Sequence, residues 1–234
     1  MTSPMLSGAA PMADFPFAVV GFDLDGTLLD TSGDLAAAVN DALASAGRAP
    51  LSVEAIRPMI GGGSRHMLAQ GMQATGGCTD DELDRLTVRL LAHYEANIAV
   101  HTRPFPGVLD ALDALAARGV TVGIMTNKYE RLAVKVLDAL DLSRRFAAVV
   151  GGDTVGVGKP APEPIQEMAR RCGGGRAAFV GDSIYDVRGA HAAGLPVVAV
   201  SFGFLQQPVA ELGADAVIDR YEELLPALER LGAS

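Results

Sequence analysis

The stretch "FAVVGFDLDGTLLD", residues 17–30, decides the fold of this chain. It begins with apolar residues and glycine, a pattern typical of a strand buried on both faces of a parallel sheet. Two acids, Asp23 and Asp25, follow directly. If the chain is still extended there, the period of two directs both carboxylates to one side and Leu24 to the other, and Gly26 lets the backbone turn. The two acids are therefore expected to face a common space.

Five further short runs rich in Val, Ala and Ile follow, at residues 120–125, 147–152, 177–182, 196–201 and 215–218. Segments with helical periodicity alternate with them, at residues 107–119, 130–140, 162–172, 185–194 and 221–231. Such alternation predicts an α/β fold with a doubly wound, Rossmann-like parallel sheet.

The chain between the first strand and residue 107 shows helical periodicity without a convincing strand, broken at "GRAP", "GGGS" and "TGGCTD". We expect it to form a small inserted helical cap, residues 32–103, on an α/β hydrolase core made of residues 17–31 and 104–234. Residues 1–16 contain no basic residue and no continuous apolar centre, so they are expected to form a disordered arm rather than a secretion signal.

The composition excludes several classes of protein. The net charge of -9 disfavours nucleic-acid binding, because that affinity comes from Lys and Arg neutralising phosphates. No apolar run reaches the roughly 18 to 20 residues that span a bilayer, and the two cysteines indicate a reducing cytoplasm. An anionic ligand must be met by local positive charge, which makes Lys128, Lys135 and Lys159 candidates. The oligomeric state is left open.

Other predicted strands also end in polar residues. Thr126 and Asn127 follow the second strand, Lys159 precedes a helix, and Asp182 and Asp186 follow the fourth strand. Singly, each could be a helix cap, a turn residue or a solvated charge. Ligands of parallel sheets bind where the carboxyl ends of the strands meet, and hydroxyl, amide and helix N–H groups suit phosphate oxygens. Together the residues favour a phosphate site.

These residues resemble the motifs of the haloacid dehalogenase-like phosphohydrolases, and the resemblance covers the chain after residue 16. The matching motifs are "DLDGT" (23–27), the Thr126-Asn127 pair, Lys159 with its following proline, and "GDSIYD" (181–186). With "GGGS" and "VSFGF", the chain is most similar to the phosphoglycolate phosphatase group. The resemblance implies a helical cap over the site and a small phosphorylated metabolite as substrate.

The resemblance also implies roles for the acids. Asp23 is expected to attack phosphorus and form an aspartyl-phosphate that water hydrolyses. Asp25 is expected to protonate the leaving alkoxide and later to deprotonate the water. A cation must offset the repulsion between carboxylate and phosphate, and Mg²⁺ usually binds one or two carboxylates plus substrate phosphate. Its expected ligands are Asp23, Asp182 and the backbone carbonyl of Asp25.

Four other residues complete the predicted site. Lys159 and Thr126 are expected to stabilise the equatorial phosphate oxygens, with Asn127 as a further phosphate partner. Asp186 is expected to orient Lys159 or a metal-bound water.

The glycine-rich segment "IGGGSRHML", residues 60–68, is the candidate for substrate selection. Arg65 and the turn amides around Gly63 are expected to reach a substrate carboxylate, which Arg can bind in a bidentate manner. The alternative is a flexible turn before an ordinary helix capped by Ser64. A carboxylate partner favours 2-phosphoglycolate as substrate, and pyrophosphate or sugar phosphates remain alternatives.

Functions of other classes fit less well. "GVGKP" is not a nucleotide-binding P-loop, because Pro160 stands where a Ser or Thr is required. Residues 34–100 contain no lysine for Schiff-base chemistry. A signalling domain phosphorylated on aspartate would be shorter and lack a cap. A non-catalytic phosphate-binding protein remains open, although no motif is missing.

Overall fold

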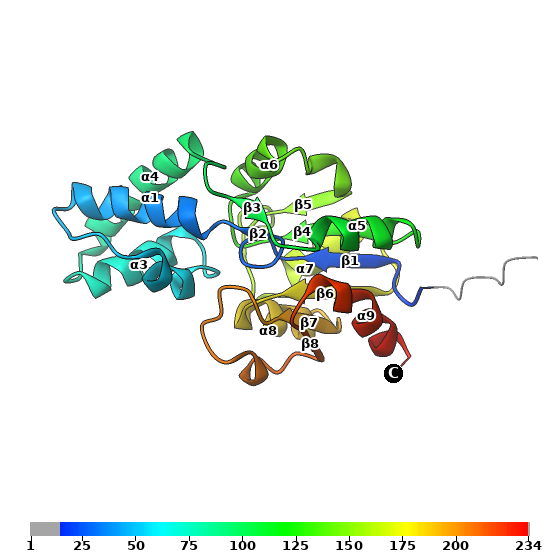
Figure 1. Ribbon diagram of the computed structural model, residues 1–234. Helices are drawn as coiled ribbons and strands as arrows, with labels where there is room; N and C mark the ends of the chain where they lie inside the picture. Colours follow the sequence, from blue (N-terminus) through cyan, green and yellow to red (C-terminus); the bar gives the residue numbers. More distant parts are fainter. Residues whose placement is uncertain (1–14, 234) are drawn as a thin grey trace, which may run out of the picture.

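The computed structural model describes residues 15–233, so most of the predicted N-terminal arm lies outside the described residues. Six strands form one sheet in the order β5-β4-β1-β6-β7-β8, and every neighbouring pair is parallel (Figure 1). The strands are β1 (Val19–Phe22), β4 (Thr121–Met125), β5 (Ala148–Val150), β6 (Ala177–Gly181), β7 (Val197–Val200) and β8 (Ala216–Ile218). The predicted α/β fold is confirmed.

Helices cover both faces of the sheet. One face packs against α5 (Val108–Ala116), α6 (Glu130–Ala139) and α9 (Leu224–Gly232), and the other against α7 (Glu163–Arg171) and α8 (Ile184–Ala192). Short 3₁₀ turns are η2 (Ser143–Arg145), η3 (Val209–Glu211) and η4 (Tyr221–Glu223). Along β1, Val20 and Phe22 join the first cluster and Val19 the second. Burial on both faces explains why the strands read as continuous apolar runs.

The central strand β1 has β4 on one side and β6 on the other. The chain therefore changes direction across the sheet at β1, and ligands of such sheets bind in the crevice at this point. Asp23, Thr126 and Asp182 each come directly after one of these three strands. The topology thus brings their side chains to one edge.

An insert of four helices follows β1 and lies beyond this edge of the sheet (Figure 1). The helices are α1 (Ser32–Ser45), α2 (Val53–Ile56), α3 (Ser64–Ala74) and α4 (Asp80–Ala96), with η1 (Arg57–Met59) between α2 and α3. They share a separate apolar cluster that includes Val39, Leu68 and Leu90. Leu132 of α6 and Phe204 of the loop after β7 join this cluster, so the insert also packs onto the rest of the molecule.

Two short strands that the sequence pattern did not reveal join the insert to the core. β2 (Leu29–Asp30) and β3 (Arg103–Pro104) pair in antiparallel fashion. Next to them, the buried carboxylate of Asp34 on α1 accepts hydrogen bonds from the backbone N–H groups of His101 and Thr102, both at 2.9 Å, and from the Thr102 hydroxyl at 2.6 Å. These bonds hold the two ends of the insert side by side.

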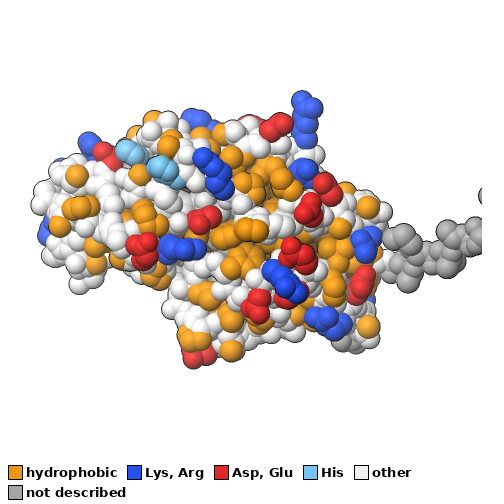
Figure 2. Space-filling model, in the orientation of Figure 1, with side chains coloured by type: hydrophobic (Ala, Val, Ile, Leu, Met, Phe, Trp, Pro, Cys, Tyr) orange, Lys and Arg blue, Asp and Glu red, His pale blue; other side chains and the backbone are white. Residues whose placement is uncertain are grey.

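The surface carries charges of both signs. On the face in Figure 2, Lys and Arg side chains are interspersed with Asp and Glu, so the described residues of this face present no basic patch of the kind that binds nucleic acid. Among the described residues, no helix combines the length and apolar character needed to cross a membrane.

Candidate active site

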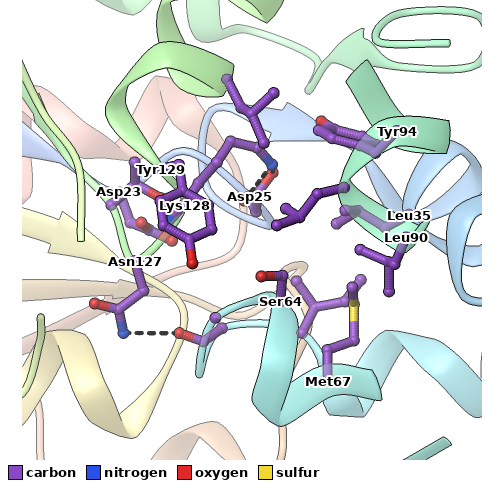
Figure 3. Close-up of a pocket in the computed structure, with 16 residues that line it drawn as sticks. Asp23, Asp25, Leu35, Ser64, Met67, Leu90, Tyr94, Asn127, Lys128 and Tyr129 are labelled. Atoms are coloured by element: carbon purple, nitrogen blue, oxygen red, sulfur yellow. Dashed lines mark hydrogen bonds and ion pairs between the residues drawn. The ribbon is translucent and has the colours of Figure 1, made fainter. Parts of the chain in front are cut away.

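Both acids that follow β1 line one pocket between the sheet edge and the insert (Figure 3). Asp23 and Asp25 are buried, and Leu24 between them is fully buried in the core. The turn requires Gly26, which has a φ of 86°. A Cβ atom there would also lie 2.2 Å from Oδ2 of Asp182. The glycine therefore allows the loop after β1 to approach the loop after β6.

Lys159 reaches Asp23 from the loop before α7. Its Nζ lies 2.7 Å from Oδ1 of Asp23, 2.6 Å from Oδ1 of Asp186 and 2.9 Å from the carbonyl oxygen of Met125. These acceptors match the three N–H donors of an ammonium group. Burial alone would lower the pKa of Lys159, but Asp186 and Asp23 raise it above its usual value. Lys159 is therefore a fixed positive charge beside Asp23.

Three buried carboxylates gather at this point, those of Asp23, Asp182 and Asp186, with ligand oxygens within 4.8 Å of one another. Burial, reinforced by Asp186 and Asp25 and opposed by Lys159, raises the pKa of Asp23 to about 7. Burial, reinforced by Asp186 and Asp23, raises the pKa of Asp182 well above its usual value. When all three carboxylates are ionised, the single ammonium of Lys159 leaves two negative charges uncompensated. Repulsion between the carboxylates adds to burial in raising the pKa values of Asp23 and Asp182. The cluster thus has the oxygen donors and the charge to hold a divalent cation such as Mg²⁺.

The loop after β6 fixes two of these acids. Ser183 caps α8, and Oδ2 of Asp186 accepts hydrogen bonds from the N–H and hydroxyl of Ser183, at 2.9 and 2.6 Å. Asp182 accepts from the N–H of Phe204 at 2.6 Å and from the hydroxyl of Thr27 at 3.1 Å. The helix cap and the acidic cluster therefore share residues: the capping box leaves Oδ1 of Asp186 facing Lys159.

The Asp25 carboxylate turns away from the acidic cluster and binds Lys128. Nζ of Lys128 lies 2.6 and 2.7 Å from the two carboxylate oxygens of Asp25, and the Thr31 hydroxyl donates to Oδ1 at 2.7 Å. Nζ also lies 4.7 Å from the centre of the Tyr94 ring on α4. From the sequence, Lys128 was a candidate cation but not a predicted site residue. The feature that could have placed it in the site is its position directly after the Thr126-Asn127 pair.

The two residues after β4 have different surroundings. Thr126 is buried and lines the pocket. The side-chain amide of Asn127 donates to the carbonyl oxygens of Gly61 at 2.9 Å and Lys159 at 3.2 Å, and its Oδ1 accepts from the N–H of Lys159 at 2.8 Å. Asn127 therefore links the glycine turn of the insert to the Lys159 loop, and both of its N–H donors are occupied by backbone partners.

The structure brings Gly63 to the pocket but not Arg65. Gly63, at a φ of 90°, is the N-cap of α3, and Ser64 is the first helical residue rather than the cap. The half-exposed guanidinium of Arg65 instead binds the carboxylates of Asp84 at 2.7 Å and Asp80 at 3.1 Å. Both acids belong to α4, whose first turns lie beside α3 and draw Arg65 to the outer surface.

The pocket is small, lies between the sheet edge and the insert, and is partly open to solvent. Its volume is about 50 Å³. Apolar side chains form the wall on the insert side, among them Leu35, Met67 and Leu90, and Leu132 of α6 adds to it (Figure 3). The apolar wall on one side and the acids on the other give the pocket a polar and an apolar end.

Comparisons with known proteins agree with this geometry. A model of the haloacid dehalogenase-like hydrolases matches residues 17–194. A phosphoglycolate phosphatase from Agrobacterium fabrum is 40% identical over 211 residues, which cover 88% of this chain and 90% of that protein. A phosphoglycolate phosphatase from Rhodospirillum rubrum is 41% identical over 233 residues, covering 94% of this chain and 96% of its own.

A solved structure shows the same arrangement. The crystal structure of "a predicted phosphoglycolate phosphatase" from Haemophilus somnus superposes with a TM-score of 0.82 at 30% identity. The match covers 90% of this chain and 97% of the other. The similarity therefore extends over both the sheet and the helical insert.

Proposed function

Since this chain belongs to the haloacid dehalogenase-like hydrolases and is a phosphatase, we propose that it hydrolyses 2-phosphoglycolate, with Asp23 as nucleophile and Mg²⁺ as cofactor. The observation that carries this proposal is that Asp23 lines the pocket, is paired with the ammonium of Lys159, and lies beside two further buried acids. The identity of the proposed substrate comes from the relatives described above, which are phosphoglycolate phosphatases.

Asp23 and Asp182 would hold Mg²⁺, together with the backbone carbonyl of Asp25. When bound, the ion would neutralise the charge that the carboxylates and the phosphoryl group bring together. The excess of two negative charges in the cluster supports this assignment, as does the raised pKa of Asp23.

The residues of the chain carry the bond changes. A carboxylate oxygen of Asp23 attacks phosphorus, the bond from phosphorus to the ester oxygen breaks, and Asp25, which enters this step in its protonated form, gives its proton to the departing alkoxide. Water then attacks the aspartyl-phosphate and loses a proton to Asp25, which releases phosphate and restores Asp23. Lys159 and the hydroxyl of Thr126 donate hydrogen bonds to the phosphoryl oxygens, where charge increases in the transition state.

Other residues act through position. Asp186 holds the ammonium of Lys159 beside Asp23 through a second hydrogen bond. Thr31 and Lys128 fix the carboxylate of Asp25 from two directions. Asn127 keeps the glycine turn of the insert against the Lys159 loop, at one side of the pocket.

The raised pKa of Asp23 predicts that Mg²⁺ stabilises the fold more at higher pH. A folded-state pKa of about 7 against a reference value of 3.8 means that stability is lost as the pH rises through this interval, because the ionised form is disfavoured in the fold. Mg²⁺ binds the ionised form and offsets this loss. The melting temperature should therefore rise more on adding Mg²⁺ at about pH 8 than at about pH 5.5.

The matched control is Asp182→Asn, which removes a ligand and should shrink the Mg²⁺ increment at every pH. An increment in the unmodified protein that is equal at both pH values, measured against EDTA by differential scanning calorimetry, would contradict the coupling between Asp23 and the cation.

The substrate is tested by measuring phosphate release in the presence of Mg²⁺ from 2-phosphoglycolate, pyrophosphate, a sugar phosphate and a chromogenic phosphate ester. We expect kcat/KM to be highest for 2-phosphoglycolate by about tenfold or more, the effect of one additional charge-assisted hydrogen bond. A higher value for pyrophosphate or the sugar phosphate would reject 2-phosphoglycolate as the substrate.

A further inference from the structure

Acids outnumber bases among the residues that line the pocket. Among the described residues that line it, Lys128 is the single basic one, and the acids are Asp23 and Asp25. A substrate with a carboxylate in addition to its phosphate needs a second cationic partner, because Lys159 lies at Asp23 and is assigned to the phosphoryl group. Arg65 lies outside the pocket. Lys128 is therefore the cation available to a second anionic group.

Lys128 retains donor capacity. An ammonium group has three N–H donors, and the two oxygens of Asp25 occupy at most two of them, while the Tyr94 hydroxyl interacts with the ammonium without a hydrogen bond of good geometry. Its Nζ is buried against the Tyr94 ring at the apolar wall, where an electrostatic interaction is stronger than in water.

The hydroxyl of Tyr94 is a second donor at the same place. Tyr94 is 2% exposed and lines the pocket, and its hydroxyl makes no hydrogen bond of good geometry with the described residues, although it interacts with the nearby ammonium of Lys128. An ammonium cannot accept a hydrogen bond, so the hydroxyl proton has no acceptor among the described residues, and a buried donor of this kind in a pocket points to a ligand. In Figure 3 the hydroxyl end of Tyr94 lies on the side of Lys128.

We infer that Lys128 and Tyr94 bind the substrate carboxylate and thereby select phosphate esters of short 2-hydroxy acids. The inference rests on the proposed function, which places the phosphoryl group at Asp23 and the ester oxygen at Asp25. In such esters the carboxylate carbon is two bonds from the ester oxygen. Because Asp25 contacts Lys128 directly, a carboxylate at this separation falls beside Nζ. One oxygen accepts from Lys128 and the other from Tyr94.

The test compares two substrates that differ at this group alone, 2-phosphoglycolate and 2-hydroxyethyl phosphate. The quantity measured is the ratio of their kcat/KM values, because any damage to Asp25 affects both substrates and cancels. Lys128→Met removes the charge and keeps the length of the side chain. It should reduce the ratio by about 10- to 100-fold, the contribution of a charge-assisted hydrogen bond.

Tyr94→Phe removes only the hydroxyl and should reduce the ratio by about 2- to 10-fold. It keeps the inference testable if Lys128→Met does not fold. Lys135→Met is the matched control, since this lysine lies exposed on α6 with Nζ bonded to the carbonyl oxygen of Glu95. It should leave the ratio unchanged.

The two proposals fail in different ways. If the unmodified enzyme shows no preference for 2-phosphoglycolate over 2-hydroxyethyl phosphate, both the proposed substrate and the carboxylate site are rejected. If the unmodified enzyme shows the preference and Lys128→Met and Tyr94→Phe both retain it, the substrate stands and the assignment to Lys128 and Tyr94 is overturned.

Discussion

Replacing Asp23 by Asn is expected to lower phosphate release from every substrate by about 10⁴-fold or more, the size of loss seen when a nucleophile is removed. The amide has nearly the same shape as the carboxylate, but it is a far weaker nucleophile and carries no charge for a cation. Steady-state assay with Mg²⁺ provides the measurement. Turnover close to that of the unmodified protein would reject Asp23 as the nucleophile.

The same variant should stay folded, and this separates loss of chemistry from loss of structure. In the unmodified protein the pKa of Asp23 is raised to about 7, chiefly by burial, so its ionised form is unfavourable without a cation. The neutral amide removes this penalty and keeps an oxygen that can accept from Lys159. In EDTA, the melting temperature of Asp23→Asn should therefore equal or exceed that of the unmodified protein. Asp110→Asn, on the exposed face of α5, is the control for an acid-to-amide change.

The second large effect is expected for Lys159→Met, which should lose both stability and activity. The substitution leaves Asp23 and Asp186 buried without their shared ammonium. Removing one partner of a buried ion pair typically costs about 3–5 kcal/mol. For a chain of this size, that corresponds to a fall in melting temperature of roughly 6–20 °C. Activity should fall by about 10²-fold or more, because a donor to the developing phosphoryl charge is lost.

Mg²⁺ gives this prediction a second readout. A cation held by the acidic cluster supplies part of the missing charge, so the melting temperature of Lys159→Met should recover more on adding Mg²⁺ than that of the unmodified protein. Lys135→Met is the control, and it should change stability by less than about 0.5 kcal/mol because its ammonium is exposed. A Lys159→Met variant that melts normally in EDTA would show that the ion pairs add nothing to stability.

The sequence predicted the sheet well because its strands are buried on both faces. Val19, Val20 and Phe22 are all buried, although their side chains lie on different faces of the sheet. Burial on both faces produces the continuous apolar run. The strands β2 and β3 have only two residues each, and no periodic pattern can be read from so short a segment. Their pairing depends on the helices that lie between them.

Within the site, the sequence allowed the positions of residues at strand ends to be predicted, but not the positions of residues on helices. Asp23, Thr126 and Asp182 share an edge because parallel strands end together there. The direction of Arg65 depends instead on α4, which carries Asp80 and Asp84. Such partners are distant in the sequence and leave no local pattern. The contact between Lys128 and Asp25 likewise joins residues 103 positions apart.

The antiparallel pair β2 and β3 has a consequence for how such proteins diversify. Because the strands that leave and rejoin the core are neighbours, about 5 Å apart, the ends of the insert already meet. The entropy of closing a loop grows slowly with its length, so segments of different size can occupy this position without rebuilding the sheet. Evolution can thus exchange the helical insert, which faces the substrate, while the residues at the sheet edge that carry out the bond changes are retained.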